Sequence, residues 1–339
     1  MKPIHFLAIA AALVVLASLP VWANQGVTFI VGLALVEAVF ALSWNLLFGF
    51  TGMASFGHAA FFAIGGYLCG AGLRYATGVP FLALLGGAGA LGALTAFLVG
   101  LVALRRSSGI HFAILTLALS EVLRVLIAYS TALGREDGLS AIPRPAVNLG
   151  VARLDLTSGQ SYYWFLLVAS ALLAWVLWLV AKGPLGRVLQ TIRQDPERAA
   201  FMGVDVWRYR LGAFTLSGAV AAVSGALYAP WAQIITPDSA HWIHSTQPML
   251  ASLLGGAQSF WGPVIGTILF TAINYATRTL IGLSEIVIGV VLLVIVLSAP
   301  SGVMGLLRRF ESRRNRPAAA AGGGARVRAA TVPTPAGEA

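Results

Sequence analysis

Charged side chains are scarce in this sequence. Of its 339 residues, 22 are Lys or Arg and 12 are Asp or Glu, which makes 10% charged. An average soluble domain carries about 25%. Hydrophobic residues make up 58% of the chain, and a protein of this size cannot hide so much apolar surface behind a polar exterior. The composition therefore excludes an ordinary soluble enzyme, a disordered chain and a nucleic-acid-binding domain.

Other absences narrow the choice further. The single cysteine, Cys69, excludes an internal disulfide and a cysteine-based metal site, and we expect no metal site elsewhere. The sequence has no Gly-x-x-x-x-Gly-Lys-Ser/Thr segment, so the chain does not bind ATP by that device. It also has no arginine-rich voltage-sensing helix and no catalytic constellation. We expect neither enzymatic activity nor a bound cofactor in this chain.

Long apolar runs take the place of these features. A membrane-spanning helix needs about 20 mostly apolar residues. By that measure the sequence predicts an all-α polytopic membrane protein with about ten transmembrane helices, some of them short or broken. The candidate spans are Ile4–Trp22, Val27–Phe48, His58–Leu73, Pro80–Leu104, Ile110–Ser130, Ser161–Ala181, Leu211–Trp231, Pro248–Ser259, Pro263–Leu280 and Glu285–Leu307. An alternative for the first run is a secretory signal, but its length favours a retained helix.

Lys and Arg gather in a few places, which predicts the orientation. They follow the fourth span, fill the interval between the sixth and seventh, and follow the last span. The positive-inside rule puts these groups and both termini in the cytoplasm, which requires an even number of spans. We expect residues 1–310 to form the transmembrane domain, with an outer (periplasmic) loop at 131–160 and a cytoplasmic loop at 182–210. Residues 311–339 are rich in Ala, Gly, Pro and Arg and are expected to be disordered.

A glycine-rich break separates the second and third spans. Irregular backbone at membrane depth is tolerated only inside protein or along a water-filled cavity, so the break predicts a solute path. The alternative is a tight turn whose glycines allow close helix packing. A similar break lies at 255–266, and paired interrupted helices point to a transport path. The residues predicted to form this path are Asn45, Gly52, Ser55, Gly57, His58, Thr116, Gly255 and Gly256. For His58 alone, packing or hydrogen bonding is favoured over a proton relay.

The cytoplasmic loop contains the signals of a short helix. Asp195 is a good N-cap, Pro196 suits the first helical position and Gly203 suits a left-handed stop. About two turns of helix are not stable alone, so the segment predicts docking against a soluble partner. The alternative is an amphipathic helix on lipid headgroups. The residues expected to transmit the partner's motion are Asp195, Pro196, Glu197, Arg198, Ala199, Ala200 and Gly203.

Three charges lie inside predicted spans. Glu37 is in the middle of the second span, and Glu121 and Arg124 lie three residues apart in the fifth. That spacing puts Glu121 and Arg124 on one helical face, so we expect an intramembrane ion pair rather than a proton relay. Few intramembrane carboxylates argue against a proton- or sodium-driven carrier.

Four segments together resemble a known family. The run Asn45–Phe62 resembles a signature of branched-chain amino-acid ABC importer permeases, and 192–228 resembles their coupling loop and next helix. The elements Gly255–Gly266 and Pro300–Gly305 resemble two further family motifs. The outer loop and the Thr116–Leu119 stretch resemble the M-type rather than the H-type subunit. Three positions depart from the family pattern, namely Gln258, Arg210 and the outer-loop stretch Arg135–Gly138.

The resemblance implies a set of partners in a bacterial inner membrane. These are a second, H-type permease subunit, two cytoplasmic ATPases that bind ATP and Mg²⁺, and a periplasmic solute-binding protein. The cargo would be a small neutral amino acid such as Leu, Ile or Val, moved by alternating access. The resemblance also leaves urea, short amides or aromatic acids as alternatives, because close relatives carry them. The departure at Arg135–Gly138 lies on the outer face and bears on the identity of the substrate or binding protein, not on the transport class. The residues alone also leave open an ion-coupled carrier or channel, and a membrane scaffold or receptor.

Overall fold

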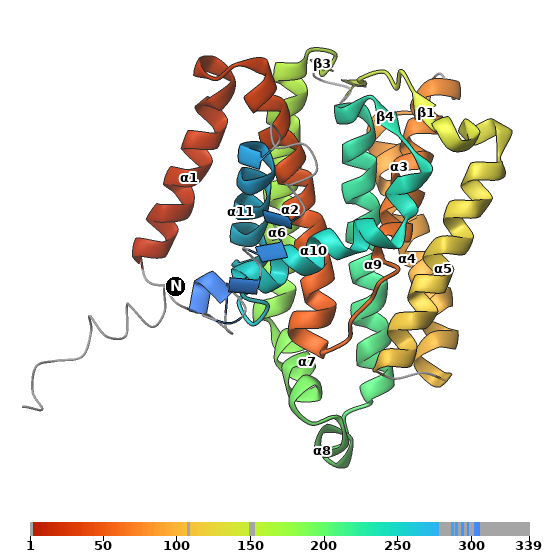
Figure 1. Cartoon of the computed structure of the whole chain (residues 1–339), viewed down its shortest axis with the longest axis vertical. Helices are drawn as coiled ribbons and strands as arrows, with labels where there is room; N and C mark the ends of the chain where they lie inside the picture. The colour runs from red at the N-terminus through yellow and green to blue at the C-terminus, as the bar shows by residue number, and fades with distance from the viewer. Residues whose placement is uncertain are drawn as a thin grey trace, which may run out of the picture.

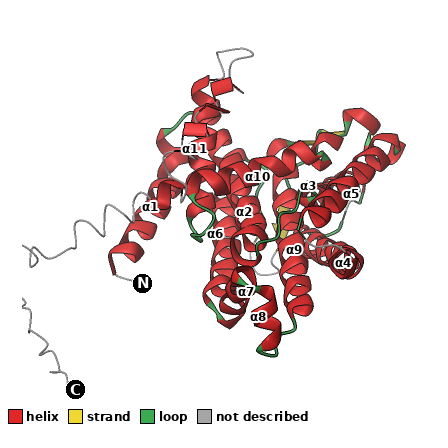
Figure 2. Ribbon diagram, turned by 60° about the horizontal axis from the view of Figure 1, so that its bottom comes forward, coloured by secondary structure: helices red, strands yellow, loops and turns green. Residues whose placement is uncertain are grey.

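The computed structural model describes residues 3–76, 78–106, 109–148, 153–277, 286–287, 289–290, 293–294, 297 and 302–305. These residues are mostly helical (Figures 1 and 2). The α-helices are α1 (Pro3–Trp22), α2 (Gln25–Thr51), α3 (His58–Tyr75), α4 (Phe81–Arg106), α5 (Ile110–Tyr129), α6 (Gly159–Lys182), α7 (Pro184–Gln194), α8 (Pro196–Phe201), α9 (Val206–Ala232), α10 (Trp242–Gly255) and α11 (Gly262–Thr277). The predicted span Glu285–Leu307 is described only in part, and the predicted tail at 311–339 lies outside the described residues.

Five of the described helices, α2, α4, α5, α6 and α9, are long and apolar enough to cross a membrane. Two of them form the centre of the bundle. In the most apolar stretch of each helix, 50% of α2 and 67% of α9 is buried, against 28% in α4, α5 and α6. The chain is therefore a multi-pass membrane protein. The count of about ten spans and the cytoplasmic position of the termini stay predictions.

The outer helices turn apolar side chains away from the protein. Leu98 on α4, Leu126 on α5 and Trp175 on α6 are each more than half exposed. In water such surfaces would be a liability, whereas in a bilayer they face lipid tails. The inner faces pack aromatic rings instead, with Phe40 and Phe62 fully buried and their centroids 5.0 Å apart.

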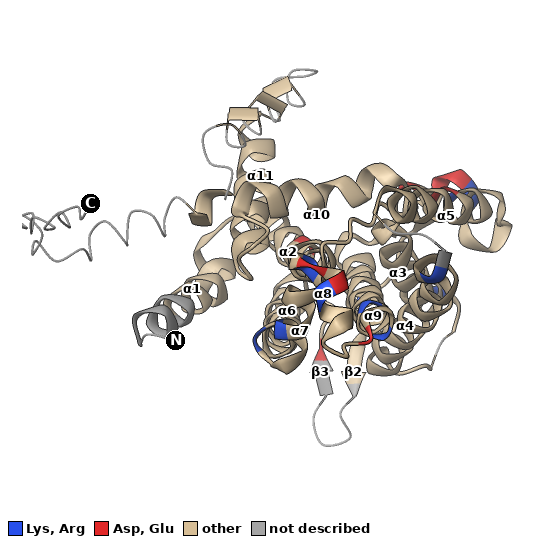
Figure 3. Ribbon diagram, turned by 90° about the horizontal axis from the view of Figure 1, so that it is seen from below, with Lys and Arg blue, Asp and Glu red and all other residues tan. Residues whose placement is uncertain are grey.

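The interior of the bundle contains a break between α2 and α3 and a helix, α10, that runs across the long helices. The helix α2 ends at Thr51, where Gly52 adopts a left-handed conformation with φ of 77°. The segment 52–57 then runs back along the bundle, and α3 begins part-way along it (Figure 1). The helix α10 lies across the direction of α2, α6 and α9 (Figures 1 and 3).

The direction of α10 corrects one expectation from the sequence. We predicted a short crossing at Pro248–Ser259, but the helix begins earlier, at Trp242, and ends at Gly255. Its 14 residues rise about 21 Å, less than the roughly 30 Å hydrocarbon core, and its first half is too polar to face lipid. It therefore lies within the bundle.

Short strands lie at the end of the bundle opposite α8 (Figure 1). The described chain also contains three 3₁₀ turns, η1 (Thr131–Leu133), η2 (Arg135–Asp137) and η3 (Pro237–Ala240). The strands are β1 (Leu139–Ser140), β2 (Ala146–Asn148), β3 (Arg153–Asp155) and β4 (Ile234–Ile235), in the antiparallel pairs β1–β4 and β2–β3. Beyond β3, the backbone and hydroxyl of Thr157 donate to the carboxyl of Asp155, and these bonds lower the pKa of that carboxyl. The predicted outer loop at 131–160 is thus ordered where it is described.

Candidate functional site

His58, at the start of α3, makes hydrogen bonds next to the first break, which is the segment 52–57 between α2 and α3. Its Nε2 lies 3.0 Å from the hydroxyl of Ser43 and 3.1 Å from that of Ser217, and the side chain is fully buried. The hydroxyl of Ser43 donates its hydrogen to the carbonyl of Phe40, and the hydroxyl of Ser217 donates its hydrogen to the carbonyl of Ser43. Nε2 must therefore carry the hydrogen that both hydroxyls accept. His58 joins α2, α3 and α9, as expected for a hydrogen-bonding histidine.

The other residues predicted at the first break lie in the same packed interior. The hydroxyl of Thr116 accepts from the backbone of Phe56 at 3.2 Å, which ties α5 to the break. A Cβ on Gly57 would lie 2.2 Å from the carbonyl oxygen of Thr116, so only glycine fits there. Asn45 and Ser55 are buried as well.

The two glycine-rich breaks touch each other. A Cβ on Gly49 would lie 2.3 Å from the carbonyl oxygen of Ala257, in the second break. Within that break, a Cβ on Gly255 would lie 1.7 Å from the carbonyl oxygen of Gly262. A Cβ on Gly302 would also clash with the backbone of Gly256. The close contact joins the end of α2 to the turn between α10 and α11.

A cavity of about 1120 Å³ opens between α2, α10 and α11. Its wall comes mainly from α2, α5, α9, η3, α10 and α11. It carries five acidic, basic or imidazole side chains: Glu37, Arg124, Asp238, His241 and His244. None of the eight residues predicted for the path is on this wall. Only Glu37 and Arg124 carried a sequence signal, as charges within apolar runs.

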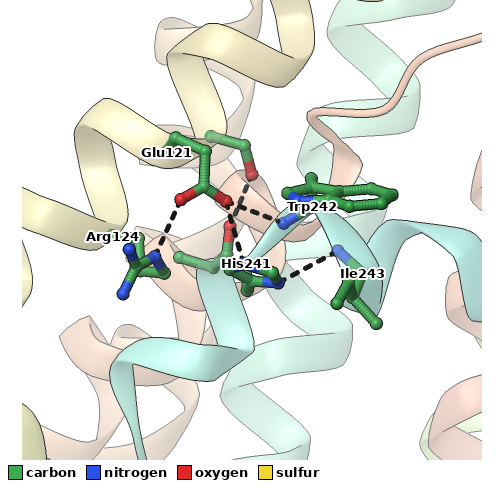
Figure 4. Close-up of polar contacts among 7 residues, drawn as sticks. Glu121, Arg124, His241, Trp242 and Ile243 are labelled. Atoms are coloured by element: carbon green, nitrogen blue, oxygen red, sulfur yellow. Dashed lines mark hydrogen bonds and ion pairs between the residues drawn. The ribbon is translucent and has the colours of Figure 1, made fainter.

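Glu121 lies behind one part of the cavity wall and contacts Arg124 and His241, which line it (Figure 4). Arg124 Nε donates to Glu121 Oε2 at 2.8 Å, so the ion pair expected from their spacing is present. Glu121 Oε1 accepts from the backbone N–H of Trp242 at 3.2 Å and lies 3.5 Å from His241 Nε2. One carboxylate thus joins α5 to the start of α10.

The deeper part of the wall carries a second carboxylate–histidine pair. Glu37 Oε1 lies 3.3 Å from His244 Nε2, and His244 Nδ1 lies 3.1 Å from the carbonyl oxygen of Ser239. The imidazole stacks on Phe40 and meets Phe62 edge to face, with centroids 5.3 and 4.8 Å away. The Glu37 side chain keeps 21% of its surface exposed, on the cavity side.

At the opposite end, the loop 182–210 forms α7, α8 and the start of α9. Lys and Arg residues of these elements lie at this end (Figure 3). In α8 the carboxylate of Asp195 accepts from the backbone of Glu197 and Arg198, Pro196 begins the helix, and Gly203 has φ of 84°. The helix is therefore capped as its residues predicted.

The C-terminal end of α8, called its tip below, consists of the exposed apolar residues Phe201 and Met202. Phe201 is 91% exposed and Met202 is 68% exposed, whereas Ala199 is buried against the rest of the chain. The preceding helix, α7, was not predicted. Its Leu189 and Ile192 are buried, and Arg193 at its end reaches the carbonyl of Gly49 at the end of α2.

Comparison with known proteins gives one consistent family. The family described as branched-chain amino acid transport system / permease component matches residues 26–296. The high-affinity branched-chain amino acid transport system permease protein LivM of Escherichia coli is 27% identical over 88% of this chain and 75% of its own length. A probable branched-chain amino acid transport permease protein LivH of Methanocaldococcus jannaschii is 27% identical over 78% of this chain and 87% of its own. No solved structure matches the chain.

Proposed function

Because the chain belongs to the family of branched-chain amino acid transport permease components, we propose that it is the M-type membrane subunit of an ATP-driven importer of branched-chain amino acids. It is a permease subunit and not the site of ATP hydrolysis. ATP and Mg²⁺ bind to two separate ATPase subunits on the cation-rich face, which is the cytoplasmic face of a bacterial inner membrane.

The observation that carries the proposal is the tip of α8. An apolar pair at the end of a capped helix, with Phe201 91% exposed, fits a hydrophobic groove of a soluble protein. The ATPase subunits are the partners that hold this tip. Their closure on ATP moves α8, and the motion enters the membrane through α7.

A second permease subunit completes the path. The chain is similar to both M-type and H-type relatives, so two related halves can pair about a pseudo-twofold axis. The cavity beside α2 and α10 is this chain's half of the substrate path. A solute-binding protein delivers the amino acid at the end opposite α8, where β1, β3 and β4 lie (Figure 1).

Reconstitution tests the proposal. The chain is combined with its H-type subunit, both ATPases and the binding protein in proteoliposomes, and uptake of labelled L-leucine is measured with and without ATP. We expect ATP-dependent uptake, and at least a tenfold loss with Phe201→Ser. The matched control is Leu185→Ser on α7, which removes a half-exposed leucine from the same loop and keeps full uptake.

ATP-dependent uptake of urea or aromatic acids in place of leucine would keep the transport class and change the cargo. Leucine uptake that persists without ATP and without the partner subunits would refute the proposal.

A further inference from the structure

Glu37 occupies an unusual place for a carboxylate. It lies near the middle of α2, a 27-residue helix whose last turn is packed in the core, and its side chain faces the cavity. Ionisable groups inside membrane-spanning segments are rare, and by default they indicate a substrate or ion path. Glu37 has one hydrogen-bond partner among the described residues, His244.

The hydrogen bonds of His244 show what kind of donor Glu37 accepts. A carbonyl oxygen can only accept, so His244 Nδ1, at 3.1 Å from the carbonyl of Ser239, carries a hydrogen. In a neutral imidazole Nε2 would then be an acceptor that faces a carboxylate oxygen at 3.3 Å. The pair is satisfied only when it holds one more proton, most simply as an imidazolium that donates to the carboxylate.

His241, one helical turn earlier, provides an internal comparison. Its Nδ1 accepts from the backbone N–H of Ile243 at 3.3 Å, so its Nε2 carries the hydrogen and faces Glu121 without any added proton. Both histidines face a glutamate, and only the Glu37–His244 pair needs an added proton to form its hydrogen bond. With that proton on the imidazole, Glu37 accepts from a positively charged N–H donor.

The charges around Glu37 support the same conclusion. Of the charged groups on the cavity wall, Arg124 is already neutralised by Glu121, and Asp238 is a further carboxylate at the outer end. Tyr228 of α9 is a neutral neighbour on the wall, and the face of Phe40 and the edge of Phe62 enclose the imidazole of His244. The wall is acidic overall, which favours a cation over an anion at Glu37.

We propose that Glu37 binds the ammonium group of the transported solute, in the place that the His244 N–H now takes. The inference rests on the proposed function for the identity of the solute as an amino acid. The apolar residues of the wall, Leu33, Leu250 and Phe270 among them, are available to its side chain.

Equilibrium binding tests the inference without any need for transport. The purified complex of this chain with its H-type subunit is titrated with leucinamide, which carries an ammonium group, and with 4-methylpentanamide, which lacks it. We expect at least tenfold tighter binding of leucinamide to the unchanged protein, and equal binding of the two amides to Glu37→Gln. Glu37→Asp keeps the charge and part of the preference, and the exposed Glu136→Gln leaves it unchanged.

The outcomes separate the two proposals. Equal affinity of the unchanged protein for both amides, or a preference that survives Glu37→Gln in a monodisperse complex, overturns the role of Glu37 whatever uptake shows. A preference that Glu37→Gln removes supports it even when leucine is not the cargo. In proteoliposomes that take up leucine, Glu37→Gln should lower uptake at least tenfold while ATP hydrolysis changes less than twofold.

Discussion

The guanidinium of Arg193 donates to the carbonyl of Gly49, across 144 residues of sequence. The last carbonyls of a helix have no partner within it, and a cation is favoured at that end, so Arg193 closes the end of α2. Arg193 also lies two residues before Asp195, the N-cap of α8. One side chain thus joins α7, which leads directly into α8, to the central helix α2, which carries Glu37.

This contact predicts that Arg193→Ala separates ATP hydrolysis from uptake. The variant leaves the Gly49 carbonyl open and removes the link between α7 and α2, so we expect uptake to fall at least tenfold while ATPase activity is retained. The control is Arg208→Ala, which removes a side chain that is 78% exposed and whose one ion pair among the described residues is with Asp205. Equal uptake by both variants would show that the contact carries no motion.

The Glu121 cluster predicts an asymmetry between single and double variants. Glu121→Leu leaves Arg124 without its partner and the Trp242 N–H without its acceptor, and removing one partner of a partly buried pair costs about 1–3 kcal/mol. Replacing both Glu121 and Arg124 by Leu removes the unpaired charge and should recover part of that loss. Thermal unfolding of the detergent-solubilised complex measures both. A double variant less stable than the single variant would contradict this.

The hydrogen on His58 Nε2 is expected to contribute to the free energy of unfolding, because the hydroxyls of Ser43 and Ser217 both accept it. His58→Gln keeps an N–H for the hydroxyls of Ser43 and Ser217, whereas His58→Leu removes it from a fully buried site. We expect His58→Leu to lower the free energy of unfolding by about 1–3 kcal/mol and His58→Gln to lower it less. If a proton relay at His58 were essential, His58→Gln would abolish uptake, which we do not expect.

Gly57 predicts a steric effect. In Gly57→Ala the new Cβ would lie 2.2 Å from the Thr116 carbonyl, so α5 and the first break must move apart. We expect a markedly lower yield of monodisperse protein and loss of uptake. Gly86→Ala on α4 is the control, because nothing lies within 4 Å of its Cβ and alanine favours a helix. A Gly57→Ala variant with unchanged yield and uptake would contradict the packing described at the break.

Local features were predictable from sequence because the residues concerned are neighbours in the chain. The caps of α8 at Asp195 and Gly203 depend on side chains within one or two turns, and the spacing of Glu121 and Arg124 determines their pairing. The broken start of α3 follows from Gly52 and Gly57 for the same reason.

Features that depend on tertiary packing were not predictable. Hydropathy gives the length of an apolar run and not its direction, so α10 was read as a short crossing. The cavity wall is formed by side chains from α2, α5, α9, η3, α10 and α11, which are far apart in the sequence. No local spacing of residues predicts the contact between Glu37 and His244. The helix α7 is an exception, because Pro184 at its first position and the spacing of Leu185, Leu189 and Ile192 are signals of an amphipathic helix that the sequence does carry.

The bare tip of α8 also bears on how the protein is made in cells. In a newly synthesised chain without a partner protein, Phe201 and Met202 expose an apolar surface to water. Chaperones and proteases recognise surfaces of this kind. Surplus chains without a companion would then be degraded, so steady-state abundance should follow the supply of whichever protein covers the tip.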